Sequence, residues 1–204
     1  MSIGLNQHIS STKKITDFIH QNSSAKIGIQ LGHSGRKGAT KKPWETEDLQ
    51  DKWNLISASP IAFNNNSPTP KEMTLEDMNT ITEQFVQATI NANEAGFDLI
   101  ELQAHHGFLL ASFLSPLTNI RTDEFGGSIE NRLKFPMLVF KAMRDAFPKE
   151  KPMSVRISAT DWAENGISEE DVFKIAEAFK GAGADIINVS TGNTVSHQKP
   201  QVGR

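Results

Sequence analysis

Four short apolar segments, each followed by a polar loop and a helical pattern, constrain the fold of this chain more than any other feature. The segments are rich in Ile, Val and Leu and occupy residues 26–31, 97–102, 153–158 and 185–190. Such short apolar runs are typical of parallel strands that are buried on both faces. Strands that alternate with helices predict an α/β fold with a parallel sheet, either an open doubly wound sheet or a (β/α) barrel.

Helix signals separate these strands. Thr74 and Ser168 each precede an aspartate by three residues, as in a capping box, and Ser128 is placed to cap the helix that follows it. Pro136 falls inside that third helical pattern, where we expect a kink or a break. An earlier helix is expected over residues 12–22, with apolar residues along one face.

Polar motifs follow the strands. The sequence "QLGHSGRKG" begins at Gln30, "QAHHGF" begins at Gln103, Arg156 lies near the end of the third strand, and Ser190 with Thr191 ends the fourth. In both candidate folds the active site lies at the carboxyl ends of the strands. The sequence therefore predicts one site that these motifs share.

The segment 32–73 is too long and too rich in Pro and Asn to be a simple connector. It contains Trp44 and Trp53, and we interpret it as an active-site loop. The whole chain of 204 residues is large enough to bury one core, so we expect a single domain over residues 1–204.

Composition and charge exclude several classes of function. The formal net charge is -3 and no basic stripe stands out, which argues against nucleic acid or an anionic membrane surface as a partner. The absence of cysteine excludes disulfides, thiolate metal sites and a cysteine nucleophile. The first residues lack a signal-peptide pattern, and no apolar run is long enough to span a bilayer, so we expect a cytoplasmic protein.

Histidines at 33, 105 and 106 raise the alternative of a zinc site. Adjacent histidines that leave a strand point in different directions, and no carboxylate stands beside them at ligand spacing. We therefore expect no metal. His105 is interpreted as a structural residue at the start of a helix.

The motifs "QLGHSGRKG", "AGFDLIELQAHHGFLLASFLSPLTNIRTDEFGGSIENRLKF" and "VRISATDW" together resemble the Old Yellow Enzyme family, the FMN-dependent ene-reductases of the NADH:flavin oxidoreductase type. The likeness runs from about residue 12 to the end. More narrowly, "PWE", "WNLISASPIAF" and "PMSVRISATDWAENG" resemble the reductase portion of the bifunctional salicylyl-CoA 5-hydroxylase and 2-aminobenzoyl-CoA monooxygenase/reductase group.

The resemblance implies a fold and its extent. The family fold is a TIM (β/α)8 barrel, and the four β/α units of this chain match strands three to six. The chain is thus expected to be the central part of a barrel, an incomplete FMN-oxidoreductase domain. Within it, "RTDEFGGSIENR" is expected to be architectural, a glycine turn that leads into a capped helix.

The resemblance also implies flavin contacts. Gln30 would face the pyrimidine edge of FMN, because an amide both donates and accepts hydrogen bonds. Arg156 would face flavin N1 and O2, where negative charge collects on reduction. Gln103 is expected to contact the flavin as well. Two alternatives stay open: Gln30 bonds to loop backbone, or Arg156 forms a structural ion pair with a carboxylate such as Glu101.

Catalytic positions depart from the family pattern. The family has His-x-x-His or His-x-x-Asn, which holds a substrate carbonyl oxygen, and a tyrosine two residues later that supplies a proton. Here Gln103, His106 and Phe108 stand at these positions. We expect Gln103 and His106 to polarise the substrate and Phe108 to contact it. Gln103 polarises more weakly than a histidine, and Phe108 has no proton to give, so protons would come from water or His106.

A neighbouring basic stretch leaves two interpretations. His33, Arg36 and Lys37 lie on the active-site side of the fold. They could contact an anionic substrate such as a CoA phosphate, or they could form a solvated loop.

The sequence therefore predicts an FMN-dependent oxidoreductase that passes hydride from NADH or NADPH, through the flavin, to an unsaturated carbonyl or aryl-CoA substrate. The alternative is a truncated, catalytically incompetent half-barrel that needs a partner chain or a second copy of itself, or that acts only as an interaction module. An open four-stranded sheet exposes two edges and an inner face. For this reason we expect the isolated chain to bind FMN weakly or not at all.

Overall fold

The computed structural model of the chain describes residues 7–39 and 54–200. Its main element is a sheet of four parallel strands in the order β1-β4-β5-β6. The strands are β1 (Gly28–Leu31), β4 (Leu99–Ala104), β5 (Met153–Ser158) and β6 (Ile186–Ser190). Each predicted apolar segment forms one strand, so the α/β class is confirmed. Within the described residues the sheet does not close into a barrel.

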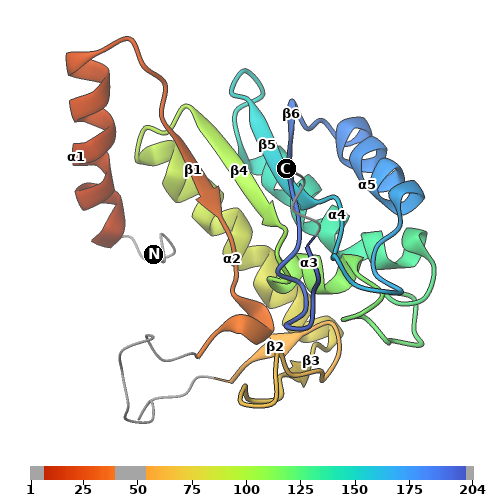
Figure 1. Cartoon of the computed structure of the whole chain (residues 1–204). Coiled ribbons are helices and arrows are strands. Elements are labelled where there is room, and N and C mark those ends of the chain that lie inside the picture. Colours follow the sequence, from red (N-terminus) through yellow and green to blue (C-terminus); the bar gives the residue numbers. More distant parts are fainter. Residues whose placement is uncertain (1–6, 40–53, 201–204) are drawn as a thin grey trace.

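The α-helices of the described residues are α1 (Gln7–Asn22), α2 (Leu75–Glu94), α3 (Leu109–Leu114), α4 (Ile129–Ala146) and α5 (Glu169–Gly181). Helices α2 to α5 connect the strands and pack against the sheet, whereas α1 precedes β1 and lies beyond the β1 edge (Figure 1). The core forms between the sheet and α2, α4 and α5. It contains four phenylalanines that are almost completely buried, Phe113, Phe135, Phe140 and Phe179.

Strand β4 is buried on one face rather than on both, whereas β5 is buried at five of its six positions. In β4, Ile100, Leu102 and Ala104 are buried under the helices, whereas the alternate residues Glu101 and Gln103 are partly exposed. Successive side chains of a strand point to opposite faces, so β4 has one apolar face and one polar face. The expectation of strands buried on both faces is wrong for β4, and its polar face becomes available for a site.

The predicted helix starts are confirmed. Thr74 caps α2 in a complete capping box with Asp77. Ser128 caps α4, and Ser168 caps α5 by accepting a hydrogen bond from the Asp171 backbone N–H. The Asp171 carboxylate accepts a hydrogen bond from the Arg132 guanidinium at 2.6 Å, which ties α5 to α4.

Pro136 does not break its helix. α4 runs without interruption from Ile129 to Ala146 although proline has no N–H to donate to the preceding turn. The expected break is absent, because Phe135, Val139 and Phe140 are fully buried against the core on either side of the proline. Tertiary packing of this face outweighs the lost hydrogen bond.

The first helix contacts the core through Thr16 and the partly buried Ile9. Thr16 is fully buried and donates its hydroxyl to the Ala95 carbonyl oxygen at 2.5 Å. Ile15 and Phe18 are 55% and 63% exposed. Ile15 and Phe18 therefore lie on the solvent-facing side of α1.

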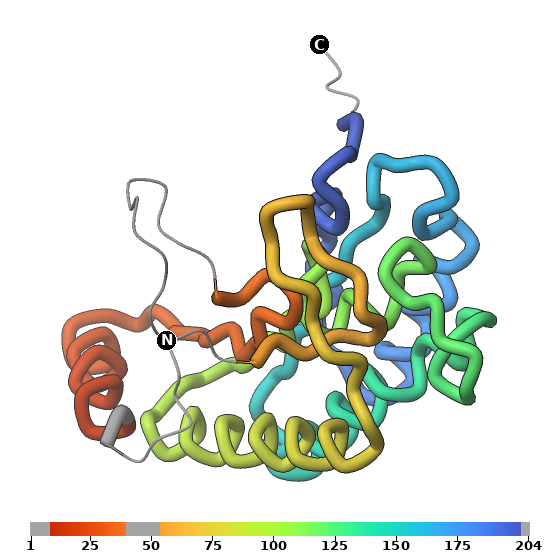
Figure 2. Tube along the Cα trace, turned by 90° about the horizontal axis from the view of Figure 1, so that it is seen from below, coloured from red at the N-terminus to blue at the C-terminus, as the bar shows by residue number. Residues whose placement is uncertain are grey.

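The segment after β1 contains more structure than a loop. Its described parts include η1 (Gly35–Lys37) and the short parallel pair β2 (Ile56–Ser57) and β3 (Lys71–Glu72). Seen from below in Figure 2, residues 54–73 lie across the carboxyl ends of the main strands. Trp44 and Trp53, which belong to the predicted active-site loop, lie outside the described residues.

The charged motif at 121–132 is architectural, as the resemblance implies. Arg121 is buried and donates to the carbonyl oxygens of Ala58 and Met73 at 3.0 and 2.9 Å, and it pairs with Asp123 at 2.5 Å. This guanidinium fastens the β2–β3 segment to the loop before α4.

Candidate functional site

A row of polar side chains covers the open face of the main sheet. Parallel register places Gln30 of β1 beside Glu101, and Gln103 beside Arg156. Side chains of parallel strands in register point to the same face. The row consists of Gln30, Glu101, Gln103, Ser154, Arg156, Asn188 and Ser190. The sequence predicts three of these seven residues as flavin contacts.

Glu101 is the centre of this polar row. Its carboxylate accepts hydrogen bonds from Gln30 Nε2 at 2.7 Å, Ser154 Oγ at 2.8 Å and Asn188 Nδ2 at 2.9 Å. Burial by itself would raise the pKa of Glu101. These three hydrogen bonds and the charge of Arg156 outweigh burial and hold the pKa below its usual value. Glu101 is therefore an anion at neutral pH and links all four strands.

The amide of Gln30 is oriented by this carboxylate. Since a carboxylate only accepts hydrogen bonds, the Gln30 nitrogen points to Glu101, and the Gln30 oxygen accepts a bond from Gln103 Nε2 at 3.1 Å. One N–H and one lone pair of the amide remain. Gln30 thus bonds to side chains of β4, not to loop backbone, and it keeps both a donor and an acceptor for a ligand.

Arg156 has unused hydrogen-bonding capacity. Its Nη2 lies 3.4 Å from Ser190 Oγ, and its Nε is buried and has no partner among the described residues. Within the same residues no carboxylate lies within 4 Å of the guanidinium, so the alternative ion pair with Glu101 is not formed there. A buried donor without a partner is costly and indicates a missing acceptor. An anionic edge such as flavin N1 and O2 fits this donor.

Gln30 and Arg156 lie on β1 and β5, with β4 between them. They are therefore not on adjacent strands, and Gln103 of β4 is placed between them in register with Arg156. A strand spacing of about 4.8 Å puts the two outer strands about 10 Å apart. This distance suits a flat ring system that lies across β4.

His106 occupies a constrained position after β4. Its backbone has φ 54, a conformation that is uncommon for any residue other than glycine. Its N–H donates to Ser158 Oγ at 2.9 Å, and its Nε2 lies 2.5 Å from Ser190 Oγ. Burial lowers the pKa of His106, and the charges of Arg156 and Lys37 lower it further, so the ring is neutral at pH 7.

Gln103 and His106, which are expected to hold one substrate oxygen, bond to opposite neighbours. The Gln103 amide crosses Gly32, where any Cβ would overlap it, and reaches Gln30 on β1. His106 bonds to Ser190 on β6. A shared oxygen would have to replace one or both of these contacts.

His105 is a packed ring rather than a ligand. It is 3% exposed, and neither ring nitrogen has a hydrogen-bond partner among the described residues. It contacts the His106 and Phe108 rings edge to face, with centroids 4.2 and 5.8 Å away. Burial, with the nearby charge of His106, lowers the pKa of His105 to about 4. Its interpretation as a structural residue is consistent with these contacts.

Arg36 and Lys37 follow β1, and both donate hydrogen bonds to backbone oxygens of the loops around the site. Arg36 is 1% exposed and donates to the backbone oxygens of Ile61, Ala62 and Thr194. Burial lowers its pKa to about 10. Carbonyl oxygens hold both terminal nitrogens of its guanidinium, and its Nε is buried without a partner among the described residues, so the solvated-loop interpretation does not describe Arg36. No sequence signal identifies such partners, because they are main-chain atoms.

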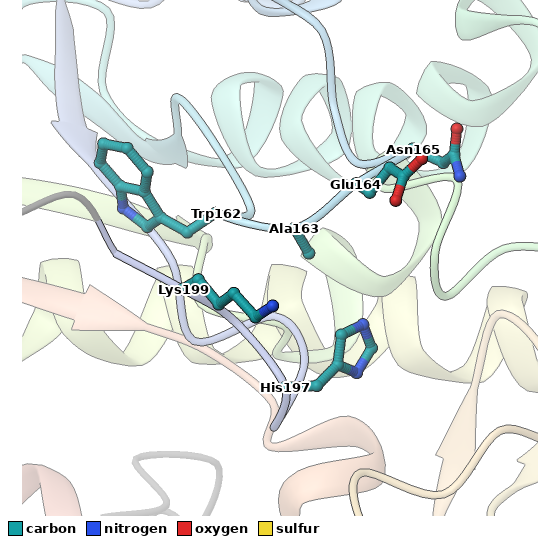
Figure 3. Close-up of a pocket in the computed structure, with 6 residues that line it drawn as sticks. All are labelled: Trp162, Ala163, Glu164, Asn165, His197 and Lys199. Atoms are coloured by element: carbon teal, nitrogen blue, oxygen red, sulfur yellow. The ribbon is translucent and has the colours of Figure 1, made fainter.

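A cavity of about 610 Å³ lies between the segments that follow β5 and β6 (Figure 3). Its lining consists of Trp162, Ala163, Glu164, Asn165, His197 and Lys199. Trp162 and Asn165 both have positive φ, 52 and 57. The Lys199 N–H donates to the Trp162 carbonyl oxygen at 2.7 Å, which joins the two walls. The sequence motif "VRISATDW" ends in this wall, but nothing in it indicates a cavity.

The described part of the chain consists of residues 7–39 and 54–200. No group of three His, Cys, Asp or Glu side chains in these residues is placed to hold a metal ion. No helix in this part of the chain is both long and apolar enough to cross a membrane.

Comparisons with known proteins identify relatives of the whole chain. The model of the NADH:flavin oxidoreductase / NADH oxidase family matches residues 3–203. An NADPH dehydrogenase of Bacillus velezensis is 40% identical over 195 residues, which are 96% of this chain and 54% of the relative. The chain thus spans about half the length of the curated relatives it matches.

Solved structures share the fold. A 2-naphthoyl-CoA reductase in complex with 2-naphthoyl-CoA superimposes with a TM-score of 0.78 at 26% identity, over 91% of this chain and 29% of the other. Morphinone reductase superimposes with a TM-score of 0.77 at 24% identity, over 92% of this chain and 53% of the other.

Proposed function

We propose, from the premise that the chain belongs to the NADH:flavin oxidoreductase / NADH oxidase family, that its polar sheet face binds FMN and serves an NAD(P)H-dependent reduction. The cofactor of this family is FMN, and its reductant is NADH or NADPH. The observation that carries the proposal is the buried Nε of Arg156, a donor without a partner on the face where the family places its flavin.

Three side chains would hold the ring. Arg156 would donate to the N1 and O2 edge, Gln30 would use its remaining N–H and lone pair on the pyrimidine edge, and Gln103 would lie between them. FMN, when bound, supplies two-electron transfer between the nicotinamide and the substrate. Glu101 accepts a hydrogen bond from the Gln30 amide and so fixes the orientation of that amide.

The substrate class we propose is an unsaturated carbonyl compound, with an aryl-CoA thioester as the narrower choice. The 2-naphthoyl-CoA reductase neighbour, whose structure is a complex with 2-naphthoyl-CoA, supports the narrower choice. His106 is neutral, and its Nε2 bonds to a hydroxyl that a substrate oxygen can replace. With Gln103 it would hold that oxygen, and Phe108 would pack against the substrate. A cytoplasmic location and a monooxygenase partner domain remain parts of the proposal.

A second candidate follows from the exposed sheet edge. In β6, Ile186 and Val189 are 45% and 61% exposed, which is unusual for apolar residues of a strand in an α/β protein. A complementary barrel half or a second copy would cover them. In this case the chain binds FMN tightly only together with that partner.

Titration of the purified chain with FMN tests the function, with quenching of flavin fluorescence as the signal. We expect saturable binding to the chain alone, weaker than a closed barrel would give. Arg156→Met should reduce the affinity at least tenfold, whereas Lys141→Met on the exposed side of α4 should leave it unchanged. Equal affinities for the chain and Arg156→Met would contradict the proposed flavin site.

A further inference from the structure

Lys37 is a charged side chain at the site whose role the flavin contacts do not explain. It lies in η1, after β1, and its Nζ donates to two backbone oxygens, those of His106 and Asn193, both at 2.9 Å. An ammonium group has three N–H donors. The two carbonyl bonds fix the position of the nitrogen and leave its third proton for another acceptor.

The surroundings of this nitrogen are aromatic. Lys37 Nζ lies 5.0 Å from the centroid of the Phe108 ring and 4.6 Å from that of Phe63. Phe108 stands where the resembling family has a tyrosine that supplies a proton, and a phenyl ring has none. The structure thus places a proton-bearing group directly against the ring that lacks one.

The electrostatic environment favours loss of the proton from this nitrogen. Burial lowers the pKa of Lys37 to about 8, and the adjacent Arg36 contributes to the shift. The charge of Asp161 partly offsets the effect of burial on the pKa of Arg36. The rings of His105 and His106, which follow β4, are neutral and so add no positive charge near Lys37 at pH 7. A general acid is most effective when its pKa lies near the working pH. An ordinary lysine, at 10.5, would hold its proton too tightly.

The other candidates for a proton donor are less suitable. His105 is buried beneath the ring of Phe108 and has a pKa of about 4, so it is neutral at pH 7. The Nε2 of His106 is held by Ser190 Oγ and is assigned to the substrate oxygen. Lys37 contacts the Phe108 ring, and among the described residues its two carbonyl bonds can survive the loss of one proton.

We propose that Lys37 is the general acid of the reduction, in the place of the family tyrosine; this inference rests on the proposed function. The reductant delivers hydride to the β-carbon of the unsaturated carbonyl, and the π electrons of the C=C bond move towards the carbonyl oxygen as an enolate. The enolate α-carbon then takes a proton from Lys37: the N–H bond breaks as the C–H bond forms. Lys37 is left as a neutral amine, which keeps both carbonyl bonds with its two remaining N–H groups, and solvent returns the proton.

The test compares three variants in the FMN-loaded chain. Lys37→Arg keeps the positive charge and donors to both carbonyls, but a guanidinium does not give up a proton. Lys37→Met removes the donor altogether. Lys141→Met, on the exposed side of α4, is the matched control. Each is assayed with an α,β-unsaturated ketone and with a quinone, whose reduction needs no proton on carbon.

We expect Lys37→Arg and Lys37→Met to lose about 100-fold in reduction of the ketone, the range of a general acid, with quinone reduction within twofold of the parent. In the parent chain, ketone reduction should fall as pH rises through about 8, because the ammonium form is required. Phe108→Tyr in the Lys37→Met background should restore part of the rate. If Lys37→Arg keeps the ketone rate within twofold, the inference is wrong although the proposed function stands.

A second readout does not depend on flavin or on activity. The rate at which an amine-reactive reagent labels Lys37, followed by mass spectrometry of its peptide, reports its fraction of free amine at each pH. A midpoint near 8 for Lys37 supports the proposed acid. A midpoint near 10.5 overturns it. Failure of the parent chain to take up FMN or to reduce quinone would instead count against the proposed function, and the labelling result alone would then decide the role of Lys37.

Discussion

The two faces of the main sheet differ in kind. The face under α2, α4 and α5 carries Ile100 and Leu102, both fully buried. The opposite face carries Glu101 and Gln103, which are held by hydrogen bonds across four strands. Because neighbouring residues of one strand serve different faces, the same six-residue strand both stabilises the fold and builds the site. The stability of the fold and the binding of a ligand therefore depend on different, alternating residues of β4.

The sharpest test of this separation uses adjacent positions of β4. Leu102→Ala should lower the free energy of unfolding by about 2–5 kcal/mol, because it opens a cavity in the core. Gln103→Ala, at the next position, should lower the free energy of unfolding by less than about 1 kcal/mol. The hydrogen bond that it removes, from the Gln103 side-chain amide to Gln30, is exposed to solvent. Urea denaturation of both variants measures the difference. Similar losses for the two would show that the polar face also carries the fold.

His105 should make the polar side sensitive to acid. Its pKa is about 4 in the folded chain and 6.5 in an ordinary environment, so between these values the unfolded chain binds a proton that the folded chain does not. The free energy of unfolding therefore falls as pH falls through this window, by about 3 kcal/mol at most. His105→Phe should remove this part of the pH dependence. An unchanged slope in denaturation curves from pH 7 to 4 would show that His105 does not cause it.

Glu101 should contribute both to the stability of the fold and to FMN binding. In Glu101→Gln one amide oxygen replaces two carboxylate oxygens that serve three donors, and the loss of stability should be about 1–2 kcal/mol. The same change frees the Gln30 amide to rotate, so FMN affinity should fall too. Thermal unfolding and FMN titration check the two effects. A loss of stability without a loss of affinity would separate Glu101 from the site.

Gln103→His should have the smallest effect on the fold and a specific one on binding. An imidazole is a better donor to an oxyanion than a neutral amide, so phenolic ligands should bind a few-fold more tightly. Their charge-transfer absorbance with bound flavin is the measurement. Unchanged affinity for a phenol would argue that Gln103 stays bonded to Gln30 and does not meet the substrate.

Local signals predicted the fold well where the cause is local. The caps at Thr74, Ser128 and Ser168 each depend on a few neighbouring residues, and all three are confirmed. Pro136 predicts a kink or a break, but α4 is continuous, because the buried packing of the helix outweighs the loss of one backbone hydrogen bond. The short strands β2 and β3 have no periodic pattern to reveal them.

The site was predictable only where a family motif marks it. The resemblance predicts Gln30 and Arg156 as flavin contacts, which stays a prediction, and the structure puts their side chains on one face of the sheet. The Glu101 network joins residues up to 87 positions apart, which no single motif contains. The bonds of Lys37 to carbonyl oxygens leave no trace in the sequence, because any residue supplies a carbonyl.

Titration of the parent chain and of Arg156→Met with FMN, side by side, tests directly whether the polar face of the sheet binds the flavin through Arg156. We predict that the unpartnered guanidinium donor takes the flavin: the parent chain saturates with one FMN, and the variant binds at least tenfold more weakly while its urea midpoint stays unchanged. Superimposable titration curves for the two proteins would contradict the assignment of this sheet face to flavin.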